Sequence, residues 1–228
     1  MTVTVGLIVV AAGSSSRMDG TDKVWAPLGG RPALWHSLER IGPAAETTVL
    51  VVHPDKVDEA ARSRWPGTAR LGIVPGGSCR QESVARGLAI MSDVDVIAVH
   101  DAARPFASVR MLREGIALLK SHDGAIPVEP LPDTIKRVSE REIVQETIDR
   151  AQLRAAQTPQ VFRAQSLRRA HAEAQRAARI GTDDASLLEA ESMTVATFPG
   201  HWSNFKITTE RDLVLARLLL DHPNMLEP

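Results

Sequence analysis

The sequence contains no tyrosine, only 4% aromatic residues and a single cysteine among its 228 residues. One cysteine, Cys79, cannot form an intrachain disulfide, which is typical of proteins in reducing compartments. So few aromatic side chains leave little material for stacking nucleic-acid bases, and a net charge of −1 offers no basic surface to a phosphate backbone or an anionic membrane. We therefore expect neither a nucleic-acid partner nor a membrane partner.

The sequence also lacks a long apolar run. Residues 3–12 are apolar and end in small side chains, which is the composition of a signal-peptide core, but no Lys or Arg precedes them and the first is Arg17. They also fall short of the ~20 residues that a membrane-spanning helix needs. We interpret residues 5–10 as a buried strand and expect a cytoplasmic protein.

What the sequence does have is an ordinary globular composition, with 43% hydrophobic and 24% charged residues. Runs of β-branched residues alternate with helical patterns, which predicts βαβ units around a mainly parallel sheet. We expect one domain over residues 1–228. The predicted strands cover residues 5–10, 47–52, 71–74, 94–100, 125–128 and 195–198. The predicted helices cover residues 33–41, 55–64, 81–91, 108–119 (with Ser108 as the cap), 164–178, 183–191 and 210–220.

The alternation breaks at residues 134–148. Two extended pieces, 134–138 and 143–148, flank a charged turn, and both faces of this predicted hairpin are polar. A lone hairpin is marginally stable in water. We therefore expect residues 133–150 to form an arm that is inserted in the domain and packs against another surface. A second subunit is the simplest candidate for that surface.

The loop after the first strand has the composition of a phosphate site. Small residues let backbone N–H groups approach an anion, and a following Arg and Lys supply positive charge. The loop lacks both the Walker pattern and the G-x-G-x-x-G pattern, because Ser15 and Met18 occupy the later glycine positions. The alternative is a solvated turn. The candidate residues are Ala11, Ala12, Gly13, Ser14, Ser15, Arg17 and Lys23.

Two more loops follow predicted strands. Gly76 and Gly77 precede a helix and permit close backbone approach to a ligand, although an ordinary glycine turn is the alternative. Asp101 follows the strand 94–100, at the end where open α/β sheets bind ligands, and a carboxylate there suits Mg²⁺. His100 has no partner histidine at ligand spacing, so we interpret it as a hydrogen-bonded structural residue.

Other charged residues carry less information by themselves. Lys206, before the last helix, has the character of a surface lysine, since lysines are mostly exposed. The arginines of residues 163–179 are interleaved with acids and alanines, which indicates a solvated helix face rather than a nucleic-acid footprint.

Taken together, seven motifs along nearly the whole chain resemble the 2-C-methyl-D-erythritol 4-phosphate cytidylyltransferase family of the sugar-nucleotidyltransferase-like fold. Two positions depart from the family pattern, with Val10 where proline is usual and Ser15 where glycine is usual. The motifs are residues 11–18 with Lys23, 75–84 (P-G-G-x-x-R-x-x-S-V), 100–106 (H-D-A-A-R-P-F), 133–136 (D-T-x-K), 157–160 (Q-T-P-Q), 182–185 (T-D-D-A) and 204–208 (N-x-K-I-T).

The resemblance implies a three-layer α/β/α sandwich of the nucleotide-diphospho-sugar transferase type, with a mixed, mainly parallel sheet and an extended β-arm for dimerisation. It also implies transfer of a cytidylyl group from CTP to 2-C-methyl-D-erythritol 4-phosphate in non-mevalonate isoprenoid biosynthesis, with Mg²⁺ as cofactor and a homodimer as the assembly. In this family the arm crosses to the partner subunit, in agreement with the interpretation of residues 133–150.

The roles of individual residues are likewise implied by the resemblance. The catalytic residues would be Arg17, Lys23, Arg150 and Lys206. CTP would be bound by Ala11, Ala12, Gly13, Ser14, Ser15, Arg17, Lys23, Gly76, Gly77, Ser78, Ser83, Asp101 and Ala102, with residues 75–83 facing the cytosine. The second substrate would be bound by Asp101, Arg104, Thr134, Arg150, Thr158, Thr182 and Lys206, and the metal by Asp101.

This chemistry suits the residues present. The nucleophile is a phosphate oxygen that is already ionised at neutral pH, so no general base is required, and positioning and positive charge supply the catalysis. Two alternatives remain: a cytidylyltransferase for another polyol phosphate such as ribitol 5-phosphate, and a nucleotide-binding regulator without catalysis. Alanines at positions 102 and 103 favour the methylerythritol substrate over ribitol, by resemblance.

Overall fold

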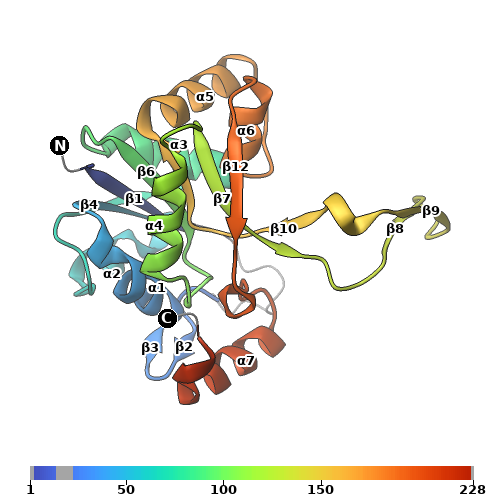
Figure 1. Ribbon diagram of the computed structural model, residues 1–228. Helices are drawn as coiled ribbons and strands as arrows, with labels where there is room; N and C mark the ends of the chain where they lie inside the picture. Colours follow the sequence, from blue (N-terminus) through green and yellow to red (C-terminus); the bar gives the residue numbers. More distant parts are fainter. Residues whose placement is uncertain (1–2, 14–22, 227–228) are drawn as a thin grey trace.

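A computed structural model describes residues 3–13 and 23–226 (Figure 1). Within them, an eight-stranded sheet has the order β10 (Arg154–Ala156), β7 (Gly124–Pro130), β11 (Gln160–Arg163), β6 (Val96–Asp101), β1 (Val5–Ala11), β4 (Thr47–Val52) and β5 (Leu71–Pro75), while β12 (Val195–Pro199) also pairs with β7. The pairings of β1, β4, β5 and β6 are parallel, as is that of β12 with β7, whereas β10 and β11 run antiparallel to their neighbours. The mixed, mainly parallel sheet is thereby confirmed.

Helices cover both faces of this sheet. Successive residues of a strand point to opposite faces, so in β1 Leu7 and Val9 join one apolar cluster and Ile8 joins the other. The first cluster is completed by α1 (Ala33–Ile41), α2 (Val57–Arg62) and α4 (Val109–Leu118), and the second by α3 (Arg80–Ile90), α5 (Ala164–Arg176) and α6 (Asp184–Ala190). These are the three layers of the predicted sandwich.

A third apolar cluster fixes the C-terminal part of the chain. Helix α7 (Glu210–Asp221) packs Leu213, Ala216 and Leu219 against the small hairpin of β2 (Pro27–Leu28) and β3 (Arg31–Pro32). Strands of two residues carry no periodic signal, so this hairpin is absent from the sequence-based prediction. Ile207 joins the cluster and its N–H donates to the Ala103 carbonyl at 2.8 Å, which brings the neighbouring Lys206 to the end of β6.

Most predicted boundaries agree with the structure, and the differences have local causes. The helix 33–41 and the strand 47–52 match at both ends, and the Ser108 hydroxyl caps α4 by accepting from the Met111 N–H at 3.3 Å. The helix predicted over 55–64 is divided into the 3₁₀ helix η2 (Pro54–Lys56) and α2, and ends early because the Trp65 indole donates to the Ala60 carbonyl at 2.9 Å. Among the described residues, no helix has the length and apolar character to cross a membrane.

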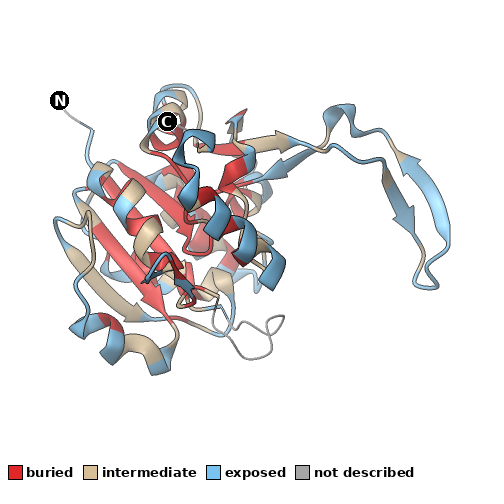
Figure 2. Ribbon diagram, turned by 90° about the horizontal axis from the view of Figure 1, so that it is seen from below, coloured by how far each residue is buried: buried red, intermediate tan, exposed pale blue. Residues whose placement is uncertain are grey.

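The arm is a two-stranded sheet that projects from the body of the protein (Figure 1). Strands β8 (Ile135–Val138) and β9 (Val144–Ile148) pair antiparallel, with an irregularity between Arg137 and Val138, and this confirms the predicted hairpin. Figure 2 shows that most of the arm is exposed, in contrast to the buried central strands. Its apolar side chains Val138, Ile143 and Val144 are themselves about half or more exposed.

Candidate active site

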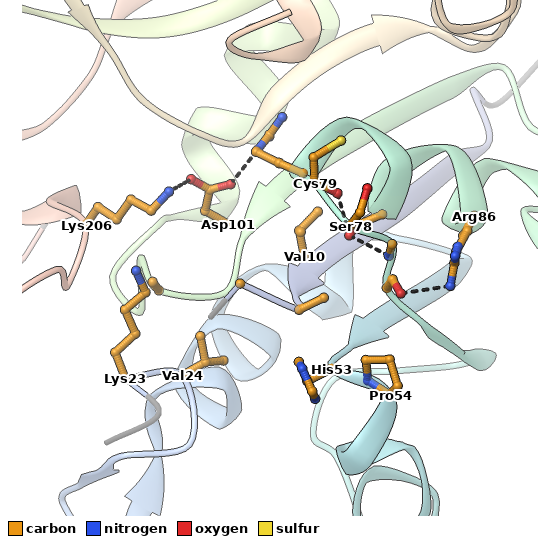
Figure 3. A pocket seen from close by; sticks show the side chains of 17 residues that line it. Val10, Lys23, Val24, His53, Pro54, Ser78, Cys79, Arg86, Asp101 and Lys206 are labelled. Carbon is orange, nitrogen blue, oxygen red and sulfur yellow. Dashed lines mark hydrogen bonds and ion pairs between the residues drawn. The ribbon is translucent and has the colours of Figure 1, made fainter. Parts of the chain in front are cut away.

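A cavity of about 670 Å³ opens where β1, β5 and β6 end. Parallel strands place their carboxyl ends at one edge of a sheet, and loops at that edge bind ligands in open α/β folds. Figure 3 shows Lys206 and Asp101 on one side of the cavity, Lys23 and Val24 below, and Ser78 and Arg86 opposite. The lining residues are Val10, Ala12, Gly13, Lys23, Val24, His53, Pro54, Gly76, Gly77, Ser78, Cys79, Arg80, Ser83, Arg86, Asp101, Ala103 and Lys206.

The predicted phosphate loop borders this cavity with both of its ends. Ala11 is buried as the last residue of β1, Ala12 and Gly13 line the cavity, and Lys23 lines it again on the far side of the loop. Ser14, Ser15 and Arg17 lie outside the described residues. The described residues on either side of this segment therefore both border the cavity.

The glycine loop is fixed by internal hydrogen bonds. The N–H of Gly76 donates to the Val52 carbonyl at 2.7 Å, and that of Gly77 donates to Ser83 Oγ at 3.1 Å. A Cβ on Gly76 would lie 2.1 Å from the Cβ of Ala12, so only glycine fits there. Ser83 is 2% exposed, so it does not lie on the helix surface, and its hydroxyl donates to the Cys79 carbonyl at 2.9 Å. A ligand that enters the cavity therefore meets a loop of fixed shape.

Two side chains of α3, which the sequence analysis did not single out, clamp this loop. One carboxylate oxygen of Glu82 accepts from both the N–H and the hydroxyl of Ser78, each at 2.7 Å, and the other accepts from Arg86 at 2.7 Å. Arg86 also donates to the Gly76 carbonyl at 2.8 Å. The hydrogen bonds from Ser78, with Arg86, lower the pKa of Glu82 to about 2. The i,i+4 spacing of Glu82 and Arg86 was the available sequence signal.

The Asp101 carboxylate lies between two cations. Its Oδ2 accepts from Lys206 Nζ at 2.7 Å, and its Oδ1 accepts from Arg80 Nε at 3.1 Å. Burial alone would raise the pKa of Asp101, but Arg80 and Lys206 hold it well below its usual range. Burial would likewise lower the pKa of Arg80, but Asp184 and Asp101 raise it above its ordinary value. Asp101 and Arg80 are therefore both charged at neutral pH.

Other predicted residues lie behind the cavity and do not line it. The Thr158 hydroxyl accepts from the Asp101 N–H at 3.0 Å and lies 3.0 Å from Nδ1 of His100, whose Nε2 contacts the Arg104 carbonyl at 3.1 Å. His100 is fully buried, and burial lowers its pKa to about 4, which confirms a structural histidine. Arg104 donates to the Asn204 carbonyl at 2.7 Å, and Ala102 is fully buried.

The remaining predicted residues lie on exposed segments. Thr134 and Arg150 belong to the arm, and Arg150 donates to the carbonyls of Leu131 and Pro132 at its base. Thr182 is exposed, just before the capping residue of α6. One protomer thus assembles Ala12, Gly13, Lys23, Gly76, Gly77, Ser78, Ser83, Asp101 and Lys206 around the cavity, but not Ala11, Ala102, Arg104, Thr134, Arg150, Thr158 or Thr182.

Comparisons with known proteins match nearly the whole chain to one family. The family model described as 2-C-methyl-D-erythritol 4-phosphate cytidylyltransferase matches residues 5–222. Relatives with that name include one from Dehalococcoides mccartyi strain CBDB1, 39% identical over 95% of this chain and 96% of its own, and one from Symbiobacterium thermophilum, 40% identical over 96% and 94%. The crystal structure of the Thermus thermophilus protein of that name is 33% identical, covers 97% of this chain and 100% of its own, and has a TM-score of 0.78.

Proposed function

Because the chain belongs to the 2-C-methyl-D-erythritol 4-phosphate cytidylyltransferase family, we propose that the cavity beside Asp101 is where the transfer takes place. The enzyme joins CTP to 2-C-methyl-D-erythritol 4-phosphate and releases pyrophosphate, in the non-mevalonate route to isoprenoid precursors. The observation that carries the proposal is the cluster of positive side chains, Lys23, Arg80, Arg86 and Lys206, around one cavity at the ligand-binding edge of the sheet.

The reaction needs positioning and charge rather than a base. An oxygen of the methylerythritol phosphate attacks the α-phosphorus of CTP, the bond to the bridging oxygen breaks, and its electron pair leaves with pyrophosphate. Charge grows on the five-coordinate phosphorus and on the leaving group, so fixed cations in a cavity stabilise the transition state more than the ground state. We assign Lys23, with Arg17, to the triphosphate and Lys206 to the incoming phosphate.

The assignment of Lys206 includes its ion pair with Asp101. Asp101 holds the ammonium group at 2.7 Å and so keeps a long, half-buried side chain directed into the cavity. A lysine held in place beforehand loses little conformational entropy when a phosphate binds. Arg80 holds the same carboxylate from the other side, so Asp101 has one orientation.

The cofactor in this proposal is Mg²⁺. Within the described part of the chain, no cluster of three or more His, Cys, Asp or Glu side chains is placed to hold a metal ion. Asp101 is the one acid among the described residues that line the cavity. That donor set fits Mg²⁺, which keeps several waters and binds through one or two carboxylates together with substrate phosphates. The ion would neutralise charge on the phosphate oxygens, with Asp101 as its protein ligand.

The arm would complete the site of a second subunit. Arg150 and Thr134 are exposed and do not line the cavity of their own protomer, while the resemblance assigns both to the methylerythritol phosphate. A polar hairpin that buries little of itself gains stability by docking on a partner. We therefore propose a homodimer in which each arm brings Arg150 to the partner's cavity, and a cytoplasmic location, where CTP is available.

The direct test is pyrophosphate release with CTP and a panel of polyol phosphates. We expect turnover with 2-C-methyl-D-erythritol 4-phosphate in the presence of Mg²⁺, and little with ribitol 5-phosphate. Binding of CTP without pyrophosphate release in the presence of any of the polyol phosphates would instead indicate a regulator. A preference for ribitol 5-phosphate would contradict the substrate assignment.

The same assay tests the base-facing loop. Uracil presents O4 where cytosine presents an amino group, so an acceptor in the site would face a second acceptor, at a cost of ~1–3 kcal/mol or about 5- to 150-fold in favour of CTP. Glu82→Gln removes the charge that fixes Ser78, so the preference for CTP should fall while turnover of CTP changes less. Equal turnover of UTP by the unaltered enzyme would rule out residues 75–83 as the base-reading segment.

A further inference from the structure

Behind the cavity, two buried polar side chains contact each other across two helices. His171 on α5 is 6% exposed and Asp184, the first residue of α6, is 1% exposed. His171 Nε2 lies 2.9 Å from Asp184 Oδ1. An ionised carboxylate can only accept, so Nε2 is the donor. Burying two such groups is costly unless each has a partner, and neither lines the cavity itself.

The second oxygen of Asp184 connects this pair to the cavity. Asp184 Oδ2 accepts from Arg80 Nη1 at 2.6 Å, and Arg80 Nε donates to Asp101 Oδ1 at 3.1 Å. Asp184 and Arg80 are 104 residues apart in the chain. The guanidinium is planar, so two carboxylates on two of its nitrogens fix both its position and its plane.

Arg80 also has one nitrogen that the protein leaves unused. Its Nη2 is buried and has no hydrogen-bond partner among the described residues, while the side chain itself lines the cavity. A buried donor without a partner is rare in native proteins and calls for an explanation. A phosphate or ribose oxygen in the cavity would supply the missing acceptor.

We propose that His171 and Asp184 are positioning residues that fix the plane of Arg80, so that Nη2 and the Asp101 carboxylate face the substrates in one arrangement. The inference rests on the proposed site. Each link removes a degree of freedom: His171 orients Asp184, Asp184 orients Arg80, and Arg80 orients Asp101, whose other oxygen holds Lys206. Preorganised groups of this kind act on the transition state more than on ground-state binding.

The test removes the first link and leaves the cavity lining intact. His171→Leu keeps a similar volume but offers Asp184 no donor. We expect kcat to fall about 10- to 100-fold, since a misplacement of about 1 Å can cost this much, and KM for CTP to change less than about 3-fold. His171→Gln retains an N–H donor at the end of its side chain and should recover kcat to within about 3-fold of the unaltered enzyme.

A matched variant on the same helix separates positioning from stability. Leu167 is fully buried on α5 and packs in the second apolar cluster. Leu167→Ala should lower the Tm by about 5–15 °C, with kcat at 25 °C within about 2-fold of the unaltered enzyme. If His171→Leu does not fold, His171→Asn, which is too short to reach Asp184, takes its place with the same expected loss of kcat.

A double-mutant cycle with Arg80→Lys tests the route. Lysine cannot hold two carboxylates in one plane. In the Arg80→Lys background, His171→Leu should therefore lower kcat by less than about a further 2-fold. If the two substitutions lowered kcat by independent factors that multiply, the proposal would be overturned. It would also be overturned by an unchanged kcat in folded His171→Leu, or by a loss of kcat in Leu167→Ala equal to that in His171→Leu. An unaltered enzyme that released no pyrophosphate would be a failure of the proposed function, whereas an active enzyme unaffected by His171→Leu would be a failure of the positioning pair alone.

Discussion

The surroundings of Asp101 in the cavity and the arm hold their polar side chains in opposite ways. In the cavity, Asp101 contacts Arg80 and Lys206, which are 21 and 105 residues away along the chain and come from separate elements. In the arm, Arg137 contacts Glu146 and Lys136 contacts Thr147, so each partner belongs to the same hairpin. Packing of the whole protomer therefore fixes the geometry around Asp101, whereas the arm is fixed only with respect to itself.

This difference divides the predicted catalytic residues into two groups. Lys23 and Lys206 lie where one protomer already gathers positive charge, while Arg150 is exposed at the base of the arm. The first group should act in any folded protomer. The second should act only where another subunit receives the arm. Experiments on the two groups should therefore give different kinds of result.

The largest effect is expected in the cavity. Lys23→Ala removes a cation beside the proposed triphosphate position, so kcat should fall by on the order of 10²–10⁴. Arg17→Ala should do the same. Steady-state pyrophosphate release measures kcat, and thermal unfolding checks that the fold is retained. Lys120→Ala is the matched control, since that lysine is exposed and does not line the cavity. A Lys23→Ala enzyme that kept more than about a third of the normal kcat would lie outside this range and remove the residue from its role.

The next prediction asks whether the arm acts in trans. Arg150→Ala alone should be nearly inactive, with a loss of about 10²-fold or more. Lys23→Ala and Arg150→Ala subunits are mixed in equal amounts, unfolded and refolded together. If Arg150 reaches the partner's cavity, a mixed dimer has one site with both lesions and one with neither. Random pairing makes half of the dimers mixed, so about a quarter of all sites should be intact.

The mixing experiment has a clear negative outcome. If Arg150 acts within its own protomer, every site keeps one lesion and mixing restores nothing. Mass spectrometry of the native assembly shows whether mixed dimers have formed. If mixed dimers are present and the activity is no higher than the mean of the two parent variants, the shared site is refuted. The lack of contacts between the arm and the cavity of its own protomer would then have no bearing on catalysis.

The same contrast explains how far the sequence could predict the structure. The arm, the Ser108 cap and the main helices and strands follow from local patterns, because turns, caps and periodicity are properties of neighbouring residues. The early end of α2 depends on the Trp65 indole and the Ala60 carbonyl, a contact that periodicity does not reveal. The antiparallel β10 and the small β2–β3 hairpin are too short to show a period.

For the site, the sequence predicted which loops meet but not how their side chains pair. The carboxyl ends of parallel strands gather at one edge, so Gly13, Gly76 and Asp101 could be placed together in advance. Arg80 and Asp184 both belong to family motifs, yet their contact spans 104 residues and has no local signature. The Thr158 hydroxyl accepts from the Asp101 N–H, a contact between residues 57 positions apart that likewise has no local signature.

A smaller effect is expected from pH, through the buried side of the site. His100 is fully buried with a pKa of about 4 when folded, against about 6.5 when unfolded. Between these values the unfolded chain binds a proton that the folded chain does not, so stability falls as pH drops from 6.5 towards 4 and does not change through this group above 6.5. The loss reaches about 3 kcal/mol.

Urea unfolding at several pH values, for the unaltered protein and for His100→Gln, isolates this contribution. The difference between their free energies of unfolding should change by up to about 3 kcal/mol between pH 6.5 and 4. Other titrating groups largely cancel in that difference. A constant difference across this range would show that burial of His100 does not disfavour its charged form.

The smallest effect is expected in the arm. The side chains of Arg137 and Glu146 lie 3.0 Å apart but are 62% and 57% exposed, so their coupling should be under about 1 kcal/mol and should weaken further in 1 M salt. Arg137→Gln, Glu146→Gln and the double variant form the cycle, and urea unfolding gives the coupling free energy.

The low value is expected because water and ions reach both groups in the protomer. If the coupling exceeded about 1 kcal/mol and persisted in high salt, this face of the arm would have to be buried in solution. Repeating the cycle over a range of protein concentrations would then tell whether a second subunit is what buries it.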